Sequence, residues 1–251
     1  MDRVFPRSKF SEKAINSGKQ IKFVQMEKLI KYGFENPVFG SNTGAYYTTT
    51  EDMLVKITQY MEKGTDYIIA YTDIVDHAEH TYHPMSDEVH QTLCGIFHAI
   101  NRILLPLLKK SDYNLIIMAD HGHETIKVND SVIHLDTEKL MDLSHIPPWG
   151  EPRAMFIDVD DRKEKELLSY LDKFKKELTI MDSDEAISAG LFGKNSVDER
   201  LRYRFGSHVI VPAKGKIIRY NYTFVRDKPY GQNGTHGGLC PDEMYIPIIV
   251  K

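Results

Sequence analysis

Three short clusters of aspartate and histidine carry the side chains in this sequence that are best suited to bind a metal ion. Asp76 and His80 stand four residues apart, Asp120 and His121 are adjacent, and His236 precedes two glycines. On one helical turn, residues four apart lie about 5–6 Å from each other, so Asp76 and His80 can share one ion. Carboxylate and imidazole together suit zinc, manganese or iron, whereas magnesium and calcium prefer all-oxygen shells. The clusters therefore indicate a transition-metal site, with zinc as the first choice.

A structural role for these residues is the competing interpretation. Single aspartates and histidines in loops are usually caps, turn residues or solvated surface groups. Eleven histidines in 251 residues also make accidental clusters easy. The metal interpretation gains support because each cluster follows a predicted strand or adjoins glycine turns, where side chains from distant segments can converge.

The elements that must position the first cluster are a helix and a strand. Thr50, followed by two acidic residues, supplies a helix start, and apolar residues then recur at helical spacing, which predicts a helix over residues 51–63. Residues 66–72 are short, apolar and rich in β-formers, as expected of a buried strand in a parallel sheet. We expect this strand to end in a polar loop that carries Asp76 and His80.

A second helix and strand repeat this order. Apolar residues from Ser86 to Leu107 predict a helix that Pro106 kinks near its end. Residues 113–119 predict a second buried strand, which ends at the Asp120 cluster. Alternating strands and helices indicate an α/β fold, in which ligands gather at the carboxyl ends of the strands. Both clusters are therefore expected at the same edge of one sheet.

The remaining segment, from residue 145 to residue 230, has a different pattern. Strands are predicted over 154–159 and 208–211, with a charged helix over 162–177 between them. We interpret 145–230 as a smaller α+β subdomain or insert within a single domain that occupies residues 1–251. A flexible loop over 234–238 and a last buried strand over 245–250 complete the prediction.

Composition limits the classes of protein that this chain can belong to. With 41% hydrophobic and 27% charged residues, it has the balance of a globular protein with a sizeable core. A formal net charge of −4 gives no general nucleic-acid surface. No run of eighteen apolar residues and no secretory signal are seen, so we expect no membrane span and a cytoplasmic location. Cys94 and Cys240 are expected to be free thiols.

Three motifs of the chain, in the same order, resemble those of the type I phosphodiesterase and nucleotide pyrophosphatase branch of the alkaline phosphatase superfamily. The pattern Tyr-x-Glu/Asp-x-Pro-Asp-x-x-Gly-His is similar to residues 71–80, and the Asp-His-Gly block is similar to residues 118–122. The closing block, His-Gly-Gly followed by Pro-x-Glu-Met, is similar to residues 235–247. Residues 185–193 and 204–211 also resemble segments of archaeal and bacterial members. The chain departs from the first pattern at two positions, with Val75 in place of proline and Glu79 in place of glycine.

The resemblance implies a fold, a cofactor and a division of labour among the clusters. It implies an alkaline phosphatase-like three-layer α/β/α sandwich with a mostly parallel sheet, incomplete at its N-terminus. Two divalent ions are implied: Asp76, His80 and His236 bind one, while Asp120 and His121 bind the other. The family's threonine or serine nucleophile comes from a region well before the first motif, and no counterpart is found among the 75 residues that precede Asp76.

Several other residues near the motifs are further candidates for the metal site. Asp73, His77, His83 and His123 are close enough to act as substitute ligands or as groups behind the ligands. Residues 40–50, rich in glycine and hydroxyls, resemble a nucleophile loop in composition, but their distance from Asp76 is wrong. We treat this segment as an ordinary loop.

The function implied by the resemblance is a metal-dependent phosphoryl-transfer hydrolase, such as a phosphodiesterase, nucleotide pyrophosphatase or phosphatase. Its substrate would be a phosphate ester or nucleotide. This chain alone is expected to be weakly active or inactive, with the nucleophile supplied by a missing N-terminal segment or a partner chain. One alternative is a phosphoglycerate mutase or phosphopentomutase type of metalloenzyme. The other is a non-catalytic metal-binding or partner-binding module.

Overall fold

The computed structural model describes residues 9–28, 43–127, 131–193, 202–220 and 231–251. The chain divides into two compact units, and one division falls inside a helix. Unit 1 comprises residues 1–77, 87–117 and 249–251, and unit 2 comprises residues 78–86 and 118–248. The predicted subdomain at 145–230 lies within unit 2, apart from those of its residues that are outside the described ranges.

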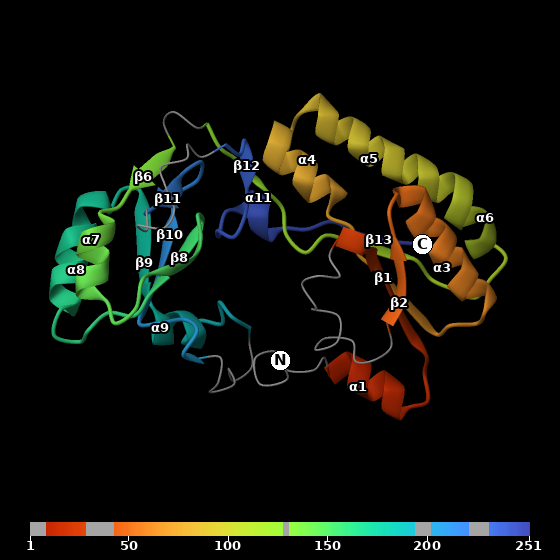
Figure 1. Ribbon diagram of the computed structural model, residues 1–251, viewed down its shortest axis with the longest axis horizontal. Helices are drawn as coiled ribbons and strands as arrows, with labels where there is room; N and C mark the ends of the chain where they lie inside the picture. The colour runs from red at the N-terminus through yellow and green to blue at the C-terminus, as the bar shows by residue number, and fades with distance from the viewer. Residues whose placement is uncertain (1–8, 29–42, 128–130, 194–201, 221–230) are drawn as a thin grey trace. The chain divides into compact units, whose positions relative to one another are not determined.

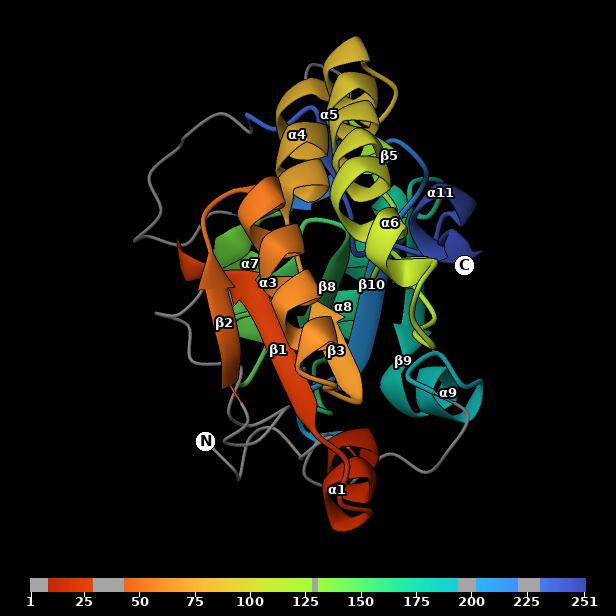
Figure 2. The same ribbon diagram turned by 90° about the vertical axis from the view of Figure 1, so that its right-hand side faces the viewer.

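Unit 1 is built on a three-stranded parallel sheet in the order β2-β1-β3. Helix α3 lies across this sheet, and α5 lies beside α3 (Figure 2). The elements of unit 1 are α1 (Lys9–Asn16), β1 (Ile21–Met26), β2 (Thr43–Tyr47), α3 (Thr50–Glu62), β3 (Tyr67–Ala70), the start of α4 (Ile74–Tyr82), α5 (Asp87–Ala99), η2 (Ile100–Leu104), α6 (Leu105–Leu108), and parts of β4 (Ile116–Met118) and β13 (Ile248–Val250).

Helix α3 confirms the predicted helix over 51–63, with one change at its start. The cap is Thr49 rather than Thr50: the hydroxyl of Thr49 accepts a hydrogen bond from the amide of Asp52 at 3.2 Å. The carboxylate of Asp52 in turn accepts from the amide of Thr48 at 3.2 Å. One amide that the helix start would leave unpaired, that of Asp52, is thus satisfied, and the Asp52 side chain binds the residue before the cap.

Pro106 acts on the second helix in the way that the sequence suggests. The helix from Asp87 is α-helical to Ala99, continues as one π-helical turn, η2, and then returns to α-helix in α6, which contains the proline. Proline has no amide hydrogen and its ring crowds the carbonyl four residues earlier, so a wider turn just before it relieves the clash.

This helix also contributes to the core of unit 1. Ala99, Ile100, Leu104 and Leu108 pack there against residues of β1, β2 and α3. Among the described helices it is the single one long and apolar enough to cross a membrane, over the 22 residues Asp87–Leu108. The criterion is length and apolar composition alone, and core helices of soluble proteins also meet it.

Unit 2 contains a four-stranded antiparallel sheet in the order β7-β8-β10-β9. Helices α7 and α8 lie side by side next to this sheet (Figure 1). The remaining pairs are β11 with β6 and β12 with β5. The further elements of unit 2 are β5 (Glu124–Thr125), β6 (Val132–His134), α7 (Thr137–Leu143), β7 (Trp149–Glu151), β8 (Ala154–Ile157), α8 (Glu164–Leu171), η3 (Asp172–Phe174), β9 (Leu178–Asp182), α9 (Ser183–Ser188), β10 (His208–Pro212), β11 (Ile217–Arg219), β12 (Gly234–Thr235) and α11 (Pro241–Met244).

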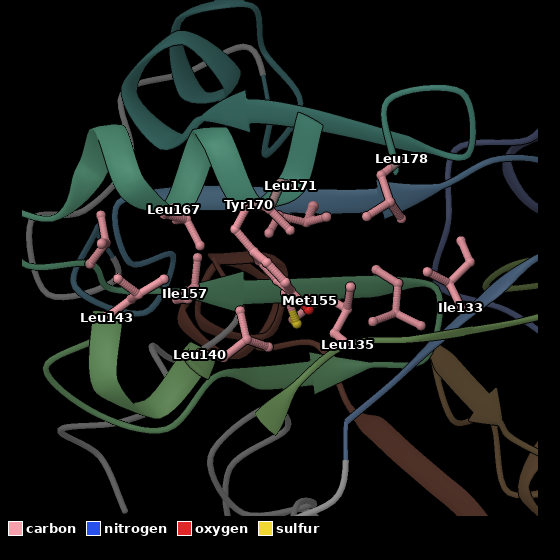
Figure 3. Packing of buried hydrophobic residues seen from close by; sticks show 13 residues of the cluster. Ile133, Leu135, Leu140, Leu143, Met155, Ile157, Leu167, Tyr170, Leu171 and Leu178 are labelled. Atoms are coloured by element: carbon pink, nitrogen blue, oxygen red, sulfur yellow. The ribbon is translucent and has the colours of Figure 1, made fainter. Parts of the chain in front are cut away.

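The core of unit 2 lies between these helices and the sheet. Leu140 and Leu143 of α7 meet Leu167 and Leu171 of α8 over Met155 of β8, and all five are fully buried (Figure 3). Each such side chain contributes about 1.5–3 kcal/mol relative to an exposed one. The predicted strands at 154–159 and 208–211 are confirmed as β8 and β10, whereas the helix predicted over 162–177 is shorter and ends in the 3-10 turn η3.

Three strands are predicted correctly as strands, but the prediction that they are buried is wrong. The strands at 66–72, 113–119 and 245–250 exist as β3, β4 and β13, but none of their residues is fully buried. Strand β3 is an edge strand paired only with β1, and β4 pairs only with β13, so each lacks a neighbour on one side within the described residues. The strands β3 and β4 also do not share one sheet, because an apolar composition predicts a strand without naming its partner.

Two predicted loops are regular structure. The polar segment after residue 72 forms helix α4, and residues 43–47, within the glycine- and hydroxyl-rich stretch 40–50, form strand β2. Residues 40–42 of that stretch lie outside the described ranges. Strand β2 is held by the parallel ladder to β1, a long-range pairing that local composition does not encode.

Candidate metal centre

Helix α4 carries the first two predicted ligands, and its ends are defined by local sequence. Asp73 precedes the helix, and its carbonyl accepts from the amide of His77 at 2.9 Å. The helix ends at His83, whose φ of 81° is left-handed, and Pro84 then prevents its continuation. Asp76 and His80 therefore stand one turn apart on one continuous helix, although the boundary between the two units falls between them.

The end of α4 is bonded to the segment that leads to His236. The amide of Asn233 donates to the carbonyl of His80 at 2.9 Å, and its side-chain nitrogen donates to the carbonyl of Thr81 at 2.7 Å. A Cβ on Gly234 would lie 2.4 Å from the carbonyl oxygen of Glu79, so only glycine fits this approach. The segment thus passes within contact distance of the helix end, which brings His236 to His80.

The same contact orients the imidazole of His80. Its Nδ1 lies 2.8 Å from the carbonyl oxygen of Gly234. A carbonyl oxygen can only accept, so Nδ1 carries the proton and Nε2 carries the lone pair. Histidines that bind metals usually donate their second ring nitrogen in this way, which fixes the tautomer and the ring orientation.

Strands β5 and β12 place the remaining histidines. They are antiparallel, with Glu124 opposite Thr235 and Thr125 opposite Gly234. His123 comes just before β5 and His236 just after β12. Asp76, His80, His123 and His236 each offer a ligand atom, and these four atoms lie within 4.8 Å of one another.

These four side chains fit a transition-metal ion. Ligands at about 2.1 Å from a tetrahedral zinc ion stand about 3.4 Å apart, so the group needs to contract only slightly on binding. Three imidazoles and one carboxylate match zinc, manganese or iron better than magnesium or calcium. Of the five predicted ligands, the structure therefore brings together Asp76, His80 and His236, and it adds His123.

Asp120 and His121 occupy a different position. The ring of His121 stacks on His236, with centroids 3.8 Å apart and planes at 19°. Its Nε2 lies 3.8 Å from a carboxylate oxygen of Asp120, whose side chain is 61% exposed. This pair is adjacent to the four-residue group but outside it, as a separate second metal position requires. Its role as a metal site stays a prediction.

The loop that carries Asp120 and His121 is held against α11. The amide of Gly122 donates to the carbonyl of Glu243 at 2.9 Å. A Cβ at Gly122 would lie 2.0 Å from the carbonyl oxygen of Asp242, so glycine is required for this approach. Residues 120–123 are thereby fixed to α11, the helix that directly follows the loop of residues 236–240, which begins with His236.

A buried ion pair anchors that loop. The guanidinium of Arg153 binds both carboxylate oxygens of Glu243, and the carboxylate also accepts from the amides of Gly238, at 2.9 Å, and Cys240, at 3.2 Å. Burial alone would raise the pKa of Glu243, but Arg153 and these two amides outweigh it and hold the pKa below its ordinary value.

A second carboxyl beside this pair behaves in the opposite way. Glu124 is 5% exposed, and burial raises its pKa above the ordinary value, partly offset by the charges of Lys214 and Arg153. Burial favours the neutral acid, and the two cationic charges do not fully offset it. Ionisation of Glu124 therefore costs folding free energy at neutral pH.

The other residues proposed as substitute or supporting groups lie in varied positions. Asp73 precedes α4 and forms an ion pair with Lys28 at 2.9 Å. His77 is exposed on α4, and His83 ends that helix. Only His123 joins the ligand group. A signal for His123 is present in the sequence, since His121 and His123 are two residues apart and both follow the second predicted strand.

Comparison with known proteins identifies the family. A sequence model for type I phosphodiesterase/nucleotide pyrophosphatase matches residues 14–239, which is most of the chain. The chain belongs to this family. The predicted membership of the alkaline phosphatase superfamily is thereby confirmed. A search of curated protein sequences finds no match to the chain.

Solved structures of related fold include other members of this superfamily. Murine ectonucleotide pyrophosphatase/phosphodiesterase 5 is similar with a TM-score of 0.68 and 18% identity, over 96% of this chain and 62% of that one. The same values hold for an inactive form of that protein in complex with AMP. Phosphonoacetate hydrolase from Sinorhizobium meliloti 1021, in complex with phosphonoformate, gives 0.64 and 16% identity, over 94% and 66%. These likenesses confirm the α/β fold class, and the chain spans 62% of the length of the murine protein.

Proposed function

We propose that this member of the type I phosphodiesterase/nucleotide pyrophosphatase family acts as a metal-dependent phosphoryl-transfer hydrolase. The single observation that carries the proposal is the convergence of Asp76, His80, His123 and His236 from three distant segments, with ligand atoms within 4.8 Å. Imidazole and carboxylate donors gathered in this way are a ligand set that suits zinc, iron or manganese.

The two clusters would share the work of binding two divalent ions, most suitably zinc. Asp76, His80 and His236 would hold one ion, and Asp120 and His121 would hold the other. When bound, a pair of such ions polarises the phosphoryl oxygens and lowers the pKa of an attacking hydroxyl. The chain's own contribution is orientation: Gly234 fixes the His80 ring, and Arg153 with Glu243 fixes the loop that carries His236.

The substrate class follows from chemistry that is shared by the relatives. Their structures hold AMP in one case and phosphonoformate in another, both small molecules that carry a phosphoryl or phosphonyl group. We infer a small phosphate ester or nucleotide as substrate here. No residue of the described chain is assigned as the hydroxyl nucleophile, so we expect weak or no turnover by this chain alone.

The test has two parts. Elemental analysis and zinc titration of the purified chain should find bound metal, and His236→Ala should weaken that binding; a chain that binds no zinc, manganese or iron would refute the proposal. Hydrolysis of bis(p-nitrophenyl) phosphate with added zinc or manganese then measures turnover. Robust activity that His236→Ala abolishes would support the hydrolase while overturning the expectation that this chain is inactive alone.

A further inference from the structure

We propose that His123 is a fourth protein ligand of the metal held by Asp76, His80 and His236, and that its imidazole fills the position an open catalytic site keeps for water or substrate. The inference rests on the proposed function, because it concerns the same metal centre. It adds a ligand from the Asp120 segment to a set that the family resemblance limits to three residues.

The packing of His123 places it among the ligands. Its side chain is 1% exposed, compared with 29% for the side chain of His121. Its ring centroid lies 4.7 Å from that of His80 and 5.0 Å from that of His236. Edge-on and tilted arrangements at these distances let three imidazoles point at one centre.

The sheet register explains why His123 and His236 meet. Thr125 opposes Gly234 and Glu124 opposes Thr235, so the next pair in this antiparallel register is His123 with His236. Directly opposite residues have Cβ atoms about 4.5–5.5 Å apart and point to the same face. The closeness of His123 to His236, a proposed ligand, is therefore set by the backbone register and does not depend on one side-chain rotamer.

A carboxylate lies close to His123, on the Nε2 side of its ring. The Oε2 atom of Glu79 is 3.6 Å from Nε2 of His123, and the Glu79 side chain is 19% exposed. Metal-bound histidines commonly have such a carboxylate or a backbone carbonyl behind them. Glu79 precedes His80 on α4, so one helical turn supplies a ligand and the group that supports another.

The arrangement changes the character of the centre. Four protein ligands in a tetrahedral set are typical of closed zinc sites, whereas catalytic sites have three and leave one position open. With His123 as a ligand, Asp76, His80, His123 and His236 would together supply four protein ligands, and the ion would have no position left open for a phosphoryl oxygen.

The experiment compares zinc affinity and coordination in the wild type, His123→Ala and His123→Gln, with His134→Ala as control. His134 is an exposed histidine of β6 in the same unit. We expect His123→Ala and His123→Gln to bind zinc at least about 100-fold more weakly, at or beyond the 10–100-fold cost of losing a supporting group. X-ray absorption of the zinc-loaded protein should count three imidazoles in the wild type and two in His123→Ala.

Imidazole rescue separates ligation from a merely structural role. Free imidazole added to His123→Ala should restore much of the lost zinc affinity and the third imidazole signal, because it can enter the vacated position. Circular dichroism of the metal-free proteins checks folding, and the glutamine variant decides the matter if the alanine variant does not fold.

The outcomes distinguish this inference from the proposed function. A wild type that binds no metal overturns both. A wild type that binds zinc through two imidazoles, with unchanged affinity in both His123 variants, overturns only the role of His123 and leaves the three-ligand centre in place.

Discussion

Arg153 and Glu243 form a fully buried, two-pronged ion pair, with Nε 2.9 Å from Oε1 and Nη2 2.6 Å from Oε2. Neither side chain is more than 1% exposed. Arg153 also donates to the carbonyls of Ala213 and Lys216, so the pair joins the end of β10 and the turn before β11 to the loop after His236. The pair thereby holds the loop that follows His236, although neither residue belongs to the four-residue group.

Glu243→Gln should destabilise unit 2 by about 3–5 kcal/mol, because it leaves the buried Arg153 guanidinium without its counter-charge. The single tryptophan of the chain, Trp149, lies in β7 of this unit, so urea unfolding followed by its fluorescence reports the effect. The control is Asp242→Asn, which removes an exposed partner of Lys214 and should leave the midpoint unchanged. Equal midpoints for wild type and Glu243→Gln would contradict the prediction.

The same pair should make stability depend on acid. The pKa of Glu243 is held below its ordinary value of 4.5 in the folded protein. A carboxyl whose pKa is lower when folded stabilises the protein above its unfolded pKa and loses that contribution as the pH falls through the folded value. The difference in unfolding free energy between wild type and Glu243→Gln should therefore be constant near pH 7 and shrink below about pH 4.5. A difference that grows on acidification would show that the sign is wrong.

Glu79→Gln should lower zinc affinity about 10–100-fold without removing a ligand, since it replaces the carboxylate behind His123. The measurement is competition with a zinc chelator of known affinity. Glu138 is an exposed glutamate of α7, and Glu138→Gln is the matched control, which should bind zinc as the wild type does. Unchanged affinity in Glu79→Gln would mean that the carboxylate does not support the imidazole.

Removal of His121 and of His236 should affect different ions. His236→Ala should weaken the tighter zinc site, because His236 belongs to the four-residue group. His121→Ala should leave that tight site and lower the affinity only of a second, weaker ion. Titration of both variants with zinc counts the equivalents of zinc that each variant binds tightly and weakly. Loss of the tight site in His121→Ala would show that the two clusters form one centre.

Leu167→Ala should destabilise unit 2 by about 2–5 kcal/mol, because a fully buried leucine leaves a cavity between α8, α7 and the sheet. The neighbouring Leu168 is 40% exposed, and Leu168→Ala should cost much less. Trp149 fluorescence during urea unfolding measures both. Equal losses would place the core of unit 2 elsewhere.

Local sequence predicted the elements of this fold well and their neighbours poorly. The start of α3 and the helix irregularity near Pro106 could be predicted, because helix caps and the effects of proline depend on adjacent residues. The exposure of β3 and β4 could not be predicted from the sequence. An apolar run indicates a strand that can be buried on both faces, but it does not show whether other elements cover that strand.

The candidate site shows the same limit. Asp76 and His80 could be paired from their spacing, because one helix fixes both. The position of His123 depends on the pairing of β5 with β12, which joins segments far apart in the chain. Nothing in the residues around His123 encodes that register, and so the sequence offered it only as one of several supporting groups.

The bond between His80 and Gly234 links residues 154 positions apart in the chain. Closing so long a loop costs entropy before any contact repays it, and contacts of this range form slowly in folding. During synthesis the chain emerges from its N-terminus, so α4 and the His123 segment exist well before the segment that orients the one ring and supplies His236. The four-residue group is therefore completed late in folding, and an ion bound by it would stabilise a fold that has already formed and would not nucleate that fold.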